Sequence, residues 1–201
     1  MADGTVHGGV AGTDGIVDIV VEIPAGSRNK YEYDHERHVI RLDRRLFTAT
    51  AYPTDYGFVP ETLALDGDPL DAMVLLADPT FPGCMVRMRV LGVFWMRDEK
   101  GPDAKLLGVL EHDPNWDHVV DLGDLPGHLL AEIEHFFTIY KDLEPGKTSY
   151  IGGFEGKAEA LRELDECRER YRSSGHGGAT DAQQVAPGTG SGSGPDNDRP
   201  A

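Results

Sequence analysis

The feature that most constrains the fold of this chain is the order of its hydrophobic patterns, because strand-like runs come first and helix-like runs come last. Val17, Ile19, Val21 and Ile23 alternate with other residues at the period of a half-buried strand, which leaves Glu22 on the opposite face. Further runs rich in Val, Leu and Met are separated by Gly, Pro and Asp. These runs cover residues 38–42, 73–77, 86–96 and 106–110. The pattern predicts a β-rich core.

Two helices are expected in the second half of the chain. Asp124 is expected to cap the first, with Pro126 in its first turn, and apolar residues then recur at helical spacing through Leu143. The sequence Glu144-Pro145-Gly146 is expected to end it. The second helix is predicted at about residues 156–172. Strands followed by helices predict an α+β fold, a small closed or curled β-barrel (OB-like) with the two helices packed against it.

The composition of the two ends sets the expected domain boundaries. Residues 173–201 contain seven Gly, three Pro and four Ser, and their one large apolar residue is Val185, so this stretch cannot bury enough surface to fold. It is predicted to be a disordered tail. Residues 1–15 hold five Gly and are predicted to be a flexible extension. The remaining residues, 16–172, are long enough for one domain.

The formal net charge of −16 excludes several kinds of partner. Binding to a nucleic-acid backbone or to an anionic membrane requires a patch of Lys and Arg, so neither is expected. An acidic protein that binds a phosphate compound must bring cations to it, and divalent metal is the natural source. Cys84 and Cys167 lack the spacing of metal ligands, and no signal peptide or membrane span is indicated, so the cytoplasm is the expected compartment.

Two clusters of aspartate are the candidate chemical centre. Asp66, Asp68 and Asp71 precede a core-type run, and Asp98 and Asp103 lie beside Lys105 in a hairpin-like connection. Each cluster alone is compatible with a solvated turn. A calcium-binding EF-hand is excluded, because its sixth position would be Asp71 where the loop needs Gly. Carboxylates crowded at the mouth of a buried strand repel one another, so a metal–phosphate site is favoured.

Other polar groups accompany these clusters. Glu22 and Glu32 lie on strands, facing away from apolar side chains. Arginine, lysine and tyrosine are suited to phosphate oxygens. Each such residue also has a plain structural explanation, such as a lysine favoured at a helix C-terminus or a tyrosine in an apolar stripe. The candidates are Lys30, Arg44, Tyr52, Tyr56, Tyr140 and Lys141.

Taken together, these segments resemble the soluble family I inorganic pyrophosphatases of bacterial type. The resemblance runs in order from about residue 17 to 172, and the string Asp66-Gly-Asp-Pro-Leu-Asp71 is close to diagnostic of that family. The companion motifs are Val21-Glu-Ile-Pro24, Asn29-Lys-Tyr-Glu32, Tyr52-Pro-Thr-Asp-Tyr-Gly-Phe58, Asp98-Glu-Lys-Gly-Pro-Asp-Ala-Lys105 and His135-Phe-Phe-Thr-Ile-Tyr-Lys-Asp-Leu-Glu144.

The resemblance implies an inorganic diphosphatase, which hydrolyses pyrophosphate to two orthophosphates by direct attack of a metal-activated water. It implies several Mg²⁺ ions per site, with Mn²⁺ as a possible substitute, and a cytoplasmic homohexamer. The implied metal ligands and supporting carboxylates are Glu22, Glu32, Asp66, Asp71, Asp98 and Asp103. The implied substrate-binding residues are Lys30, Arg44, Tyr56, Lys105, Tyr140 and Lys141. Asp68 matches the usual catalytic base, although Asp103 is sometimes given the role of proton acceptor.

Three positions fall where the family varies. His35 matches a histidine found in only some bacterial members, Lys100 lies where members differ, and residues 151–154 depart from the commoner sequences. Two other functions stay open from the residues alone. One is a metal-dependent hydrolase of nucleoside triphosphates or polyphosphate, although the sequence has no Walker loop. The other is a phosphate- or metal-binding module without turnover, which Mg²⁺-dependent phosphate release would distinguish.

Overall fold

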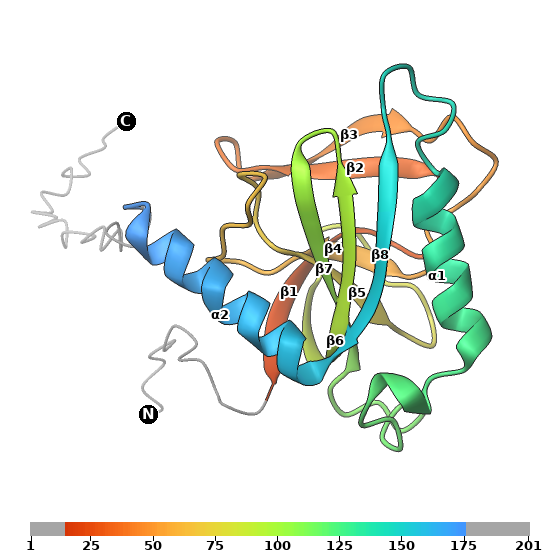
Figure 1. Cartoon of the computed structure of the whole chain (residues 1–201), viewed down its shortest axis with the longest axis vertical. Coiled ribbons are helices and arrows are strands. Elements are labelled where there is room, and N and C mark those ends of the chain that lie inside the picture. Colours follow the sequence, from red (N-terminus) through yellow and green to blue (C-terminus); the bar gives the residue numbers. More distant parts are fainter. Residues whose placement is uncertain (1–14, 176–201) are drawn as a thin grey trace, which may run out of the picture.

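The computed structural model describes residues 15–175, and in that part of the chain the main sheet curls into a closed ring (Figure 1). The strands are ordered β1-β4-β5-β7-β6-β8, and β1 also pairs with β6, so the first five strands close a barrel. Neighbouring strands are antiparallel except for β5 and β7, which are parallel. The predicted fold class is therefore confirmed. The strands are β1 (Ile16–Ile23), β4 (Asp55–Phe58), β5 (Asp71–Leu75), β6 (Met85–Asp98), β7 (Gly101–Leu110) and β8 (Ser149–Gly156).

The long strand β6 is what joins β8 to the barrel. Its first residues pair with β1, its later residues pair with β8, and β7 runs along its other edge. The register shifts between Val90 and Gly92, as at a β-bulge. At Gly92 an added Cβ would lie 2.4 Å from Leu122 Cδ1 and 2.5 Å from the Glu155 carbonyl oxygen, so only glycine lets these segments approach so closely.

A separate two-stranded sheet lies across one end of the barrel, at the top of Figure 1. It consists of β2 (Asn29–Asp34) and β3 (Val39–Arg45), paired antiparallel. Lys30 is opposite Arg44 in this pair. Directly opposed residues on one face of a sheet have their Cβ atoms about 5 Å apart, so the hairpin delivers two cations to one place.

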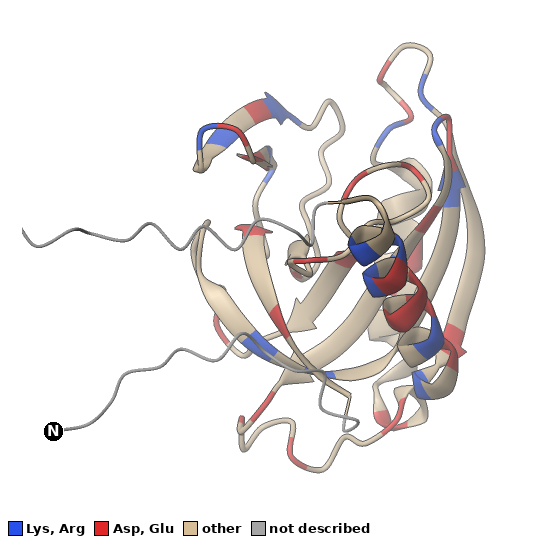
Figure 2. Ribbon diagram, turned by 90° about the vertical axis from the view of Figure 1, so that its left-hand side faces the viewer, with Lys and Arg blue, Asp and Glu red and all other residues tan. Residues whose placement is uncertain are grey.

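The core lies on both faces of the barrel strands. Met73 and Leu107 belong to one apolar cluster and their neighbours Val74 and Leu106 to the other, and all four are fully buried. Strands that are buried on both faces have nearly continuous apolar sequences, which explains the runs in β5, β6 and β7. The helix α1 (Gly127–Ile139) packs into the first cluster and α2 (Lys157–Ser173) into the second. Charged residues of both signs alternate along α2 (Figure 2).

The predicted limits of the first helix are wrong at both ends. Pro126 is the N-cap residue of α1, and Asp124 instead belongs to a short 3₁₀ turn, Leu122–Asp124. The Asp124 carboxylate accepts hydrogen bonds from the backbone N–H groups of Val120 and Asp121. The helix ends at Ile139, before the expected stop, and the side chain of Leu143 is exposed.

Two strands were not predicted, namely β4 and β8. The first residue of the expected C-terminal tail, Ser173, is still part of α2, whereas residues 1–14 and 176–201 lie outside the described residues. The predicted extension and tail therefore stay predictions. No helix between residues 15 and 175 has the length and apolarity needed to cross a membrane.

Candidate active site

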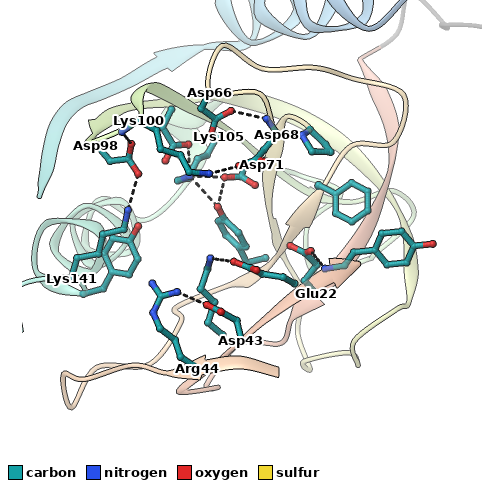
Figure 3. Close-up of a pocket in the computed structure, with 18 of the residues that line it drawn as sticks. Glu22, Asp43, Arg44, Asp66, Asp68, Asp71, Asp98, Lys100, Lys105 and Lys141 are labelled. Atoms are coloured by element: carbon teal, nitrogen blue, oxygen red, sulfur yellow. Dashed lines mark hydrogen bonds and ion pairs between the residues drawn. The ribbon is translucent and has the colours of Figure 1, made fainter. Parts of the chain in front are cut away.

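A cleft of about 410 Å³ lies between the two-stranded sheet and the neighbouring end of the barrel, and charged side chains line it (Figure 3). The structure brings the predicted site residues except Tyr52 to this one cleft, although they come from seven strands, one loop and the end of α1. Tyr52 does not line it, but its ring is buried against that of Tyr56, with centroids 5.4 Å apart. The predicted residues in the lining are Glu22, Lys30, Glu32, Arg44, Tyr56, Asp66, Asp68, Asp71, Asp98, Asp103, Lys105, Tyr140 and Lys141.

Lys105 is the centre of the cleft floor. The parallel pairing of β5 and β7 places Asp71 opposite Lys105, and Asp103 lies two residues earlier on the same face of β7. The ammonium Nζ lies 2.7 Å from Asp71 Oδ2 and 2.6 Å from Asp103 Oδ1, and it donates to the Tyr56 hydroxyl at 3.0 Å. Lys105 is only 1% exposed. A buried cation needs such partners, so the charge of Lys105 depends on both aspartates.

Burial and neighbouring charges set the protonation of this group. Burial acts to lower the pKa of Lys105, but Asp103 and Asp71 outweigh it and the pKa is raised, so the side chain stays charged. Burial raises the pKa of Asp103, with Lys105 opposing and Asp71 adding to the shift. Burial also raises the pKa values of Tyr56 and Tyr140. These two phenols are therefore neutral hydrogen-bond donors at physiological pH.

Glu22 reaches the cleft from β1. Its apolar neighbours Val21 and Ile23 point to the other face and are fully buried, as the alternation predicted. The Glu22 carboxylate accepts the backbone N–H of Tyr33 at 2.6 Å. Burial raises its pKa to about 7, and nearby Asp71 adds to that effect. On β2, the Lys30 ammonium contacts the carboxylate of Glu32, two residues further along the same strand, at 2.5 Å.

The end of α1 supplies the opposite wall. Lys141 follows the last turn of the helix and contacts Asp98 Oδ2 at 2.8 Å, with both side chains about nine-tenths buried. Burial acts to raise the pKa of Asp98, but hydrogen bonds from Lys141 and from the backbone N–H of Lys100 lower it. Lys141 therefore follows the C-terminus of α1, as its plain structural explanation expects, and also lines the cleft.

Sequence reasoning missed several charged residues at this site. Asp43 lines the cleft and forms an ion pair with Arg44, and Glu144 contacts the same guanidinium at 3.0 Å. Glu99 and Lys147 also line the cleft and pair with each other. Asp43 and Glu99 are adjacent in sequence to predicted site residues, and this adjacency could have identified them. The contact between Arg44 and Glu144 joins residues 100 positions apart, and no local sequence pattern indicates it.

The net charge of the lining is negative. In the part of the chain that the structure describes, nine carboxylates and six Lys or Arg side chains line the cleft. A polyanion would be repelled unless further cations accompany it. Burial is the largest contribution that raises the pKa of Asp66, and the nearby Asp68 and Asp71 add to it. The cleft therefore favours binding of a cation.

The donor set suits a hard divalent metal, but the side chains are not arranged around one. Within residues 15–175 no three carboxylates are grouped so that they would hold one metal ion. Asp71 and Asp103 are instead both turned toward Lys105. The ligand chemistry nevertheless fits, since nine carboxylates line the cleft, and Mg²⁺ and Mn²⁺ prefer carboxylate oxygen.

Comparison with known proteins agrees with this geometry. The family model described as inorganic pyrophosphatase matches residues 19–172 of the chain. The chain belongs to the inorganic pyrophosphatase family. The inorganic pyrophosphatase of Streptomyces coelicolor is 54% identical over 158 residues, which cover 79% of this chain and 97% of that protein. The inorganic pyrophosphatase of Methanosarcina acetivorans is 52% identical over 156 residues, which cover 78% and 92%.

Solved structures of the family have the same fold. The inorganic pyrophosphatase of Thermus thermophilus matches with a TM-score of 0.78 and 47% identity, over 81% of this chain and 95% of that one. The enzyme of Helicobacter pylori matches with a TM-score of 0.79 and 42% identity, over 82% and 98%. Every predicted site residue of this inorganic pyrophosphatase family member lies within the matched range. Their individual roles stay predictions.

Proposed function

We propose that this chain is an inorganic diphosphatase that hydrolyses pyrophosphate to two orthophosphates in the cleft, with Mg²⁺ as its cofactor and Mn²⁺ as a possible substitute. The observation that carries the proposal is the pairing of an excess of carboxylates with six lining cations in one cleft of a pyrophosphatase fold. Carboxylates hold divalent metal and cations hold phosphate, so the cleft is suited to a metal–pyrophosphate complex.

Asp66, Asp71, Asp98 and Asp103 would hold the metal, with Glu22 and Glu32 in support. When bound, Mg²⁺ supplies charge neutralisation of the polyanion and a lowered pKa for a coordinated water. The acceptor for the water's proton is Asp68, whose carboxylate is exposed at the cleft mouth, with Asp103 as the alternative. Because Asp103 Oδ1 contacts the buried ammonium of Lys105 and its side chain is only 12% exposed, Asp68 is the better placed of the two.

The remaining residues bind pyrophosphate and its products. Lys30, Arg44, Lys105 and Lys141 would contact phosphate oxygens, and Tyr56 and Tyr140 would donate hydrogen bonds without adding charge. As the new P–O bond forms and the bridging P–O bond breaks, negative charge grows on the departing phosphate, and these groups stabilise it. No covalent bond to the protein is needed.

The first test is release of orthophosphate from pyrophosphate by the purified chain, with and without millimolar Mg²⁺ and with ATP as a parallel substrate. We expect fast release from pyrophosphate only when the metal is present, and much slower release from ATP. Equal rates on ATP would favour the triphosphatase alternative. Metal binding without phosphate release would indicate a binding module.

We further propose a homohexamer in the cytoplasm. The resemblance to the bacterial enzymes supports the assembly, and large apolar side chains such as Leu42, Phe47, Phe81 and Met85 are more than half exposed in the single chain. Light scattering would test it, and a mass of one chain would contradict it. The free thiols of Cys84 and Cys167 are typical of a reducing compartment.

A further inference from the structure

The turn between β6 and β7 carries three successive charged residues, and each contacts a different segment of the chain. Asp98 pairs with Lys141 after α1, Glu99 pairs with Lys147 before β8, and Lys100 pairs with Asp68 before β5. The first two contacts attach the turn to one wall of the cleft. The third crosses the cleft mouth, and Figure 3 shows Lys100 extended from beside Asp98 toward Asp68.

The carboxylate of Asp68 has little else to fix its direction. Its side chain is 61% exposed, and it follows Gly67, whose φ of +93° makes the loop turn sharply. Among residues 15–175, Lys100 is the one side chain recorded in hydrogen-bond contact with this carboxylate, with Nζ 2.7 Å from Oδ2. An exposed aspartate without a partner samples several rotamers, so this contact selects one of them.

Lys100 is itself held in place. Its backbone N–H donates to Asp98 Oδ1 at 2.8 Å, and Asp98 is buried against Lys141. The path from the wall of the cleft to Asp68 is therefore continuous, and the Lys100 side chain along it is 55% exposed. The Lys100 side chain is more exposed than those of Lys30, Lys105 and Lys141, which lie deeper in the cleft.

We propose that Lys100 is a positioning residue that orients the Asp68 carboxylate across the cleft mouth for acceptance of a proton from the attacking water. The inference rests on the proposed function, because it assumes that Asp68 is the proton acceptor. Misplacing a catalytic group lowers the rate of the chemical step far more than it changes substrate affinity. Lys100 should therefore act on kcat rather than on KM.

The test compares K100Q, K100R and a control with the unmodified chain, using steady-state hydrolysis of pyrophosphate at saturating Mg²⁺. The control is R37Q, since Arg37 is exposed, pairs with Asp34 at 2.8 Å and does not line the cleft. We expect K100Q to lower kcat about three- to tenfold with KM changed less than about twofold. K100R, which keeps the charge and the donors, should retain at least about half of kcat, and R37Q should leave both constants unchanged.

A second measurement does not depend on activity. Thermal unfolding in a chelator is compared for K100Q, D68N and the double variant D68N/K100Q. If the ion pair forms in solution, K100Q lowers Tm by about 1–3 °C more in the parent than in the D68N background. Equal shifts in the two backgrounds would show that the two side chains are not coupled, so that Lys100 does not hold the Asp68 carboxylate, and the proposal would be wrong.

The kinetic outcomes also separate two roles for Lys100. If K100Q raised KM and left kcat unchanged, Lys100 would be a phosphate-binding cation. If K100Q raised kcat, the ion pair would be inhibitory. Either result would overturn the proposal that Lys100 is a positioning residue. In the D68N background K100Q should cause no further loss of kcat, because there is no carboxylate left to orient. Absence of hydrolysis by the parent chain would instead count against the proposed function, while the thermal comparison would still report on the pair.

Discussion

Asp68 and Asp71 are three residues apart and have different surroundings. The Asp71 side chain is 26% exposed and contacts both Lys105 and Tyr56, whereas the Asp68 side chain is 61% exposed and contacts Lys100 at the surface. Asp71 is thus part of the cleft floor, where buried charges must be balanced. Asp68 lies at the surface, where its carboxylate can meet water as well as Lys100.

We therefore expect different results when each is changed to asparagine. D68N should lower kcat by about 10²- to 10⁴-fold, the usual effect of losing a general base, and change Mg²⁺ affinity little. D71N should weaken Mg²⁺ binding at least about tenfold, because a charged ligand of the cation is lost. Calorimetric titration with Mg²⁺, together with steady-state kinetics, checks both. Equal loss of metal affinity in the two variants would contradict the assigned roles.

Glu22 gives a pH-dependent prediction for the metal-free protein. Its pKa is raised to about 7 in the folded state from an ordinary value near 4.5, so between these values the folded chain binds more protons than the unfolded chain. Stability therefore falls as the pH rises through 7, by up to about 3 kcal/mol from this group. E22Q removes the charge, so it should raise Tm clearly at pH 8 and little at pH 5 in chelator.

A matched control for that experiment is E36Q, since Glu36 is an exposed carboxylate outside the cleft. It should shift Tm similarly at both pH values. If Tm of E22Q and of the unmodified chain changed with pH in parallel, ionisation of Glu22 would not destabilise the fold. That result would contradict the raised pKa.

At the scale of single elements, β4 depends on one glycine. Gly57 lies opposite Val21 on β1, and a Cβ added there would be 1.9 Å from the backbone carbonyl oxygen of Val20. The clash is with main chain, so it cannot be relieved by a rotamer change. G57A should therefore reduce the free energy of unfolding by about 2–4 kcal/mol or prevent β1 and β4 from pairing.

Urea denaturation measures this loss, with G127A as the control. Gly127 is the first residue of α1 and has open space where a Cβ would be added. Alanine favours helix over glycine, so G127A should be neutral or stabilise by no more than about 1 kcal/mol. A similar loss in both variants would argue against the close packing of β1 and β4.

The elements that could be predicted from sequence are those with a long, regular apolar pattern. The runs in β1, β5, β6 and β7 lie on strands, and both helices are present. β4 is only four residues long, which is too short to show an alternating pattern. β8 contains Gly152 and Gly153 and few β-branched residues, so its sequence does not predict a strand. Tyr140 and Leu143 continued the helical spacing past the end of α1, which is why its end was placed too late.

At the scale of the whole molecule, a closed or curled barrel was predicted, but the strands that close it could not be. The sequence indicated a closed or curled sheet, but the pairing of β1 with β6 joins residues about 70 positions apart, and no local pattern records it. Candidate site residues could nevertheless be named from the sequence, because the aspartates and lysines fall in compact motifs. Contacts between motifs, such as Lys100 with Asp68, became visible only in three dimensions.

The parallel pairing of β5 with β7 determines when a newly made chain can become an enzyme. β6 and β7 are neighbours in sequence and can form a hairpin early, whereas Asp71 meets Lys105 only after a loop spanning 34 residues has closed. Until then Lys105 lacks one of the two carboxylates that balance it. We therefore expect the cleft floor to be assembled in the late steps of folding, so that a half-folded chain has no complete cleft.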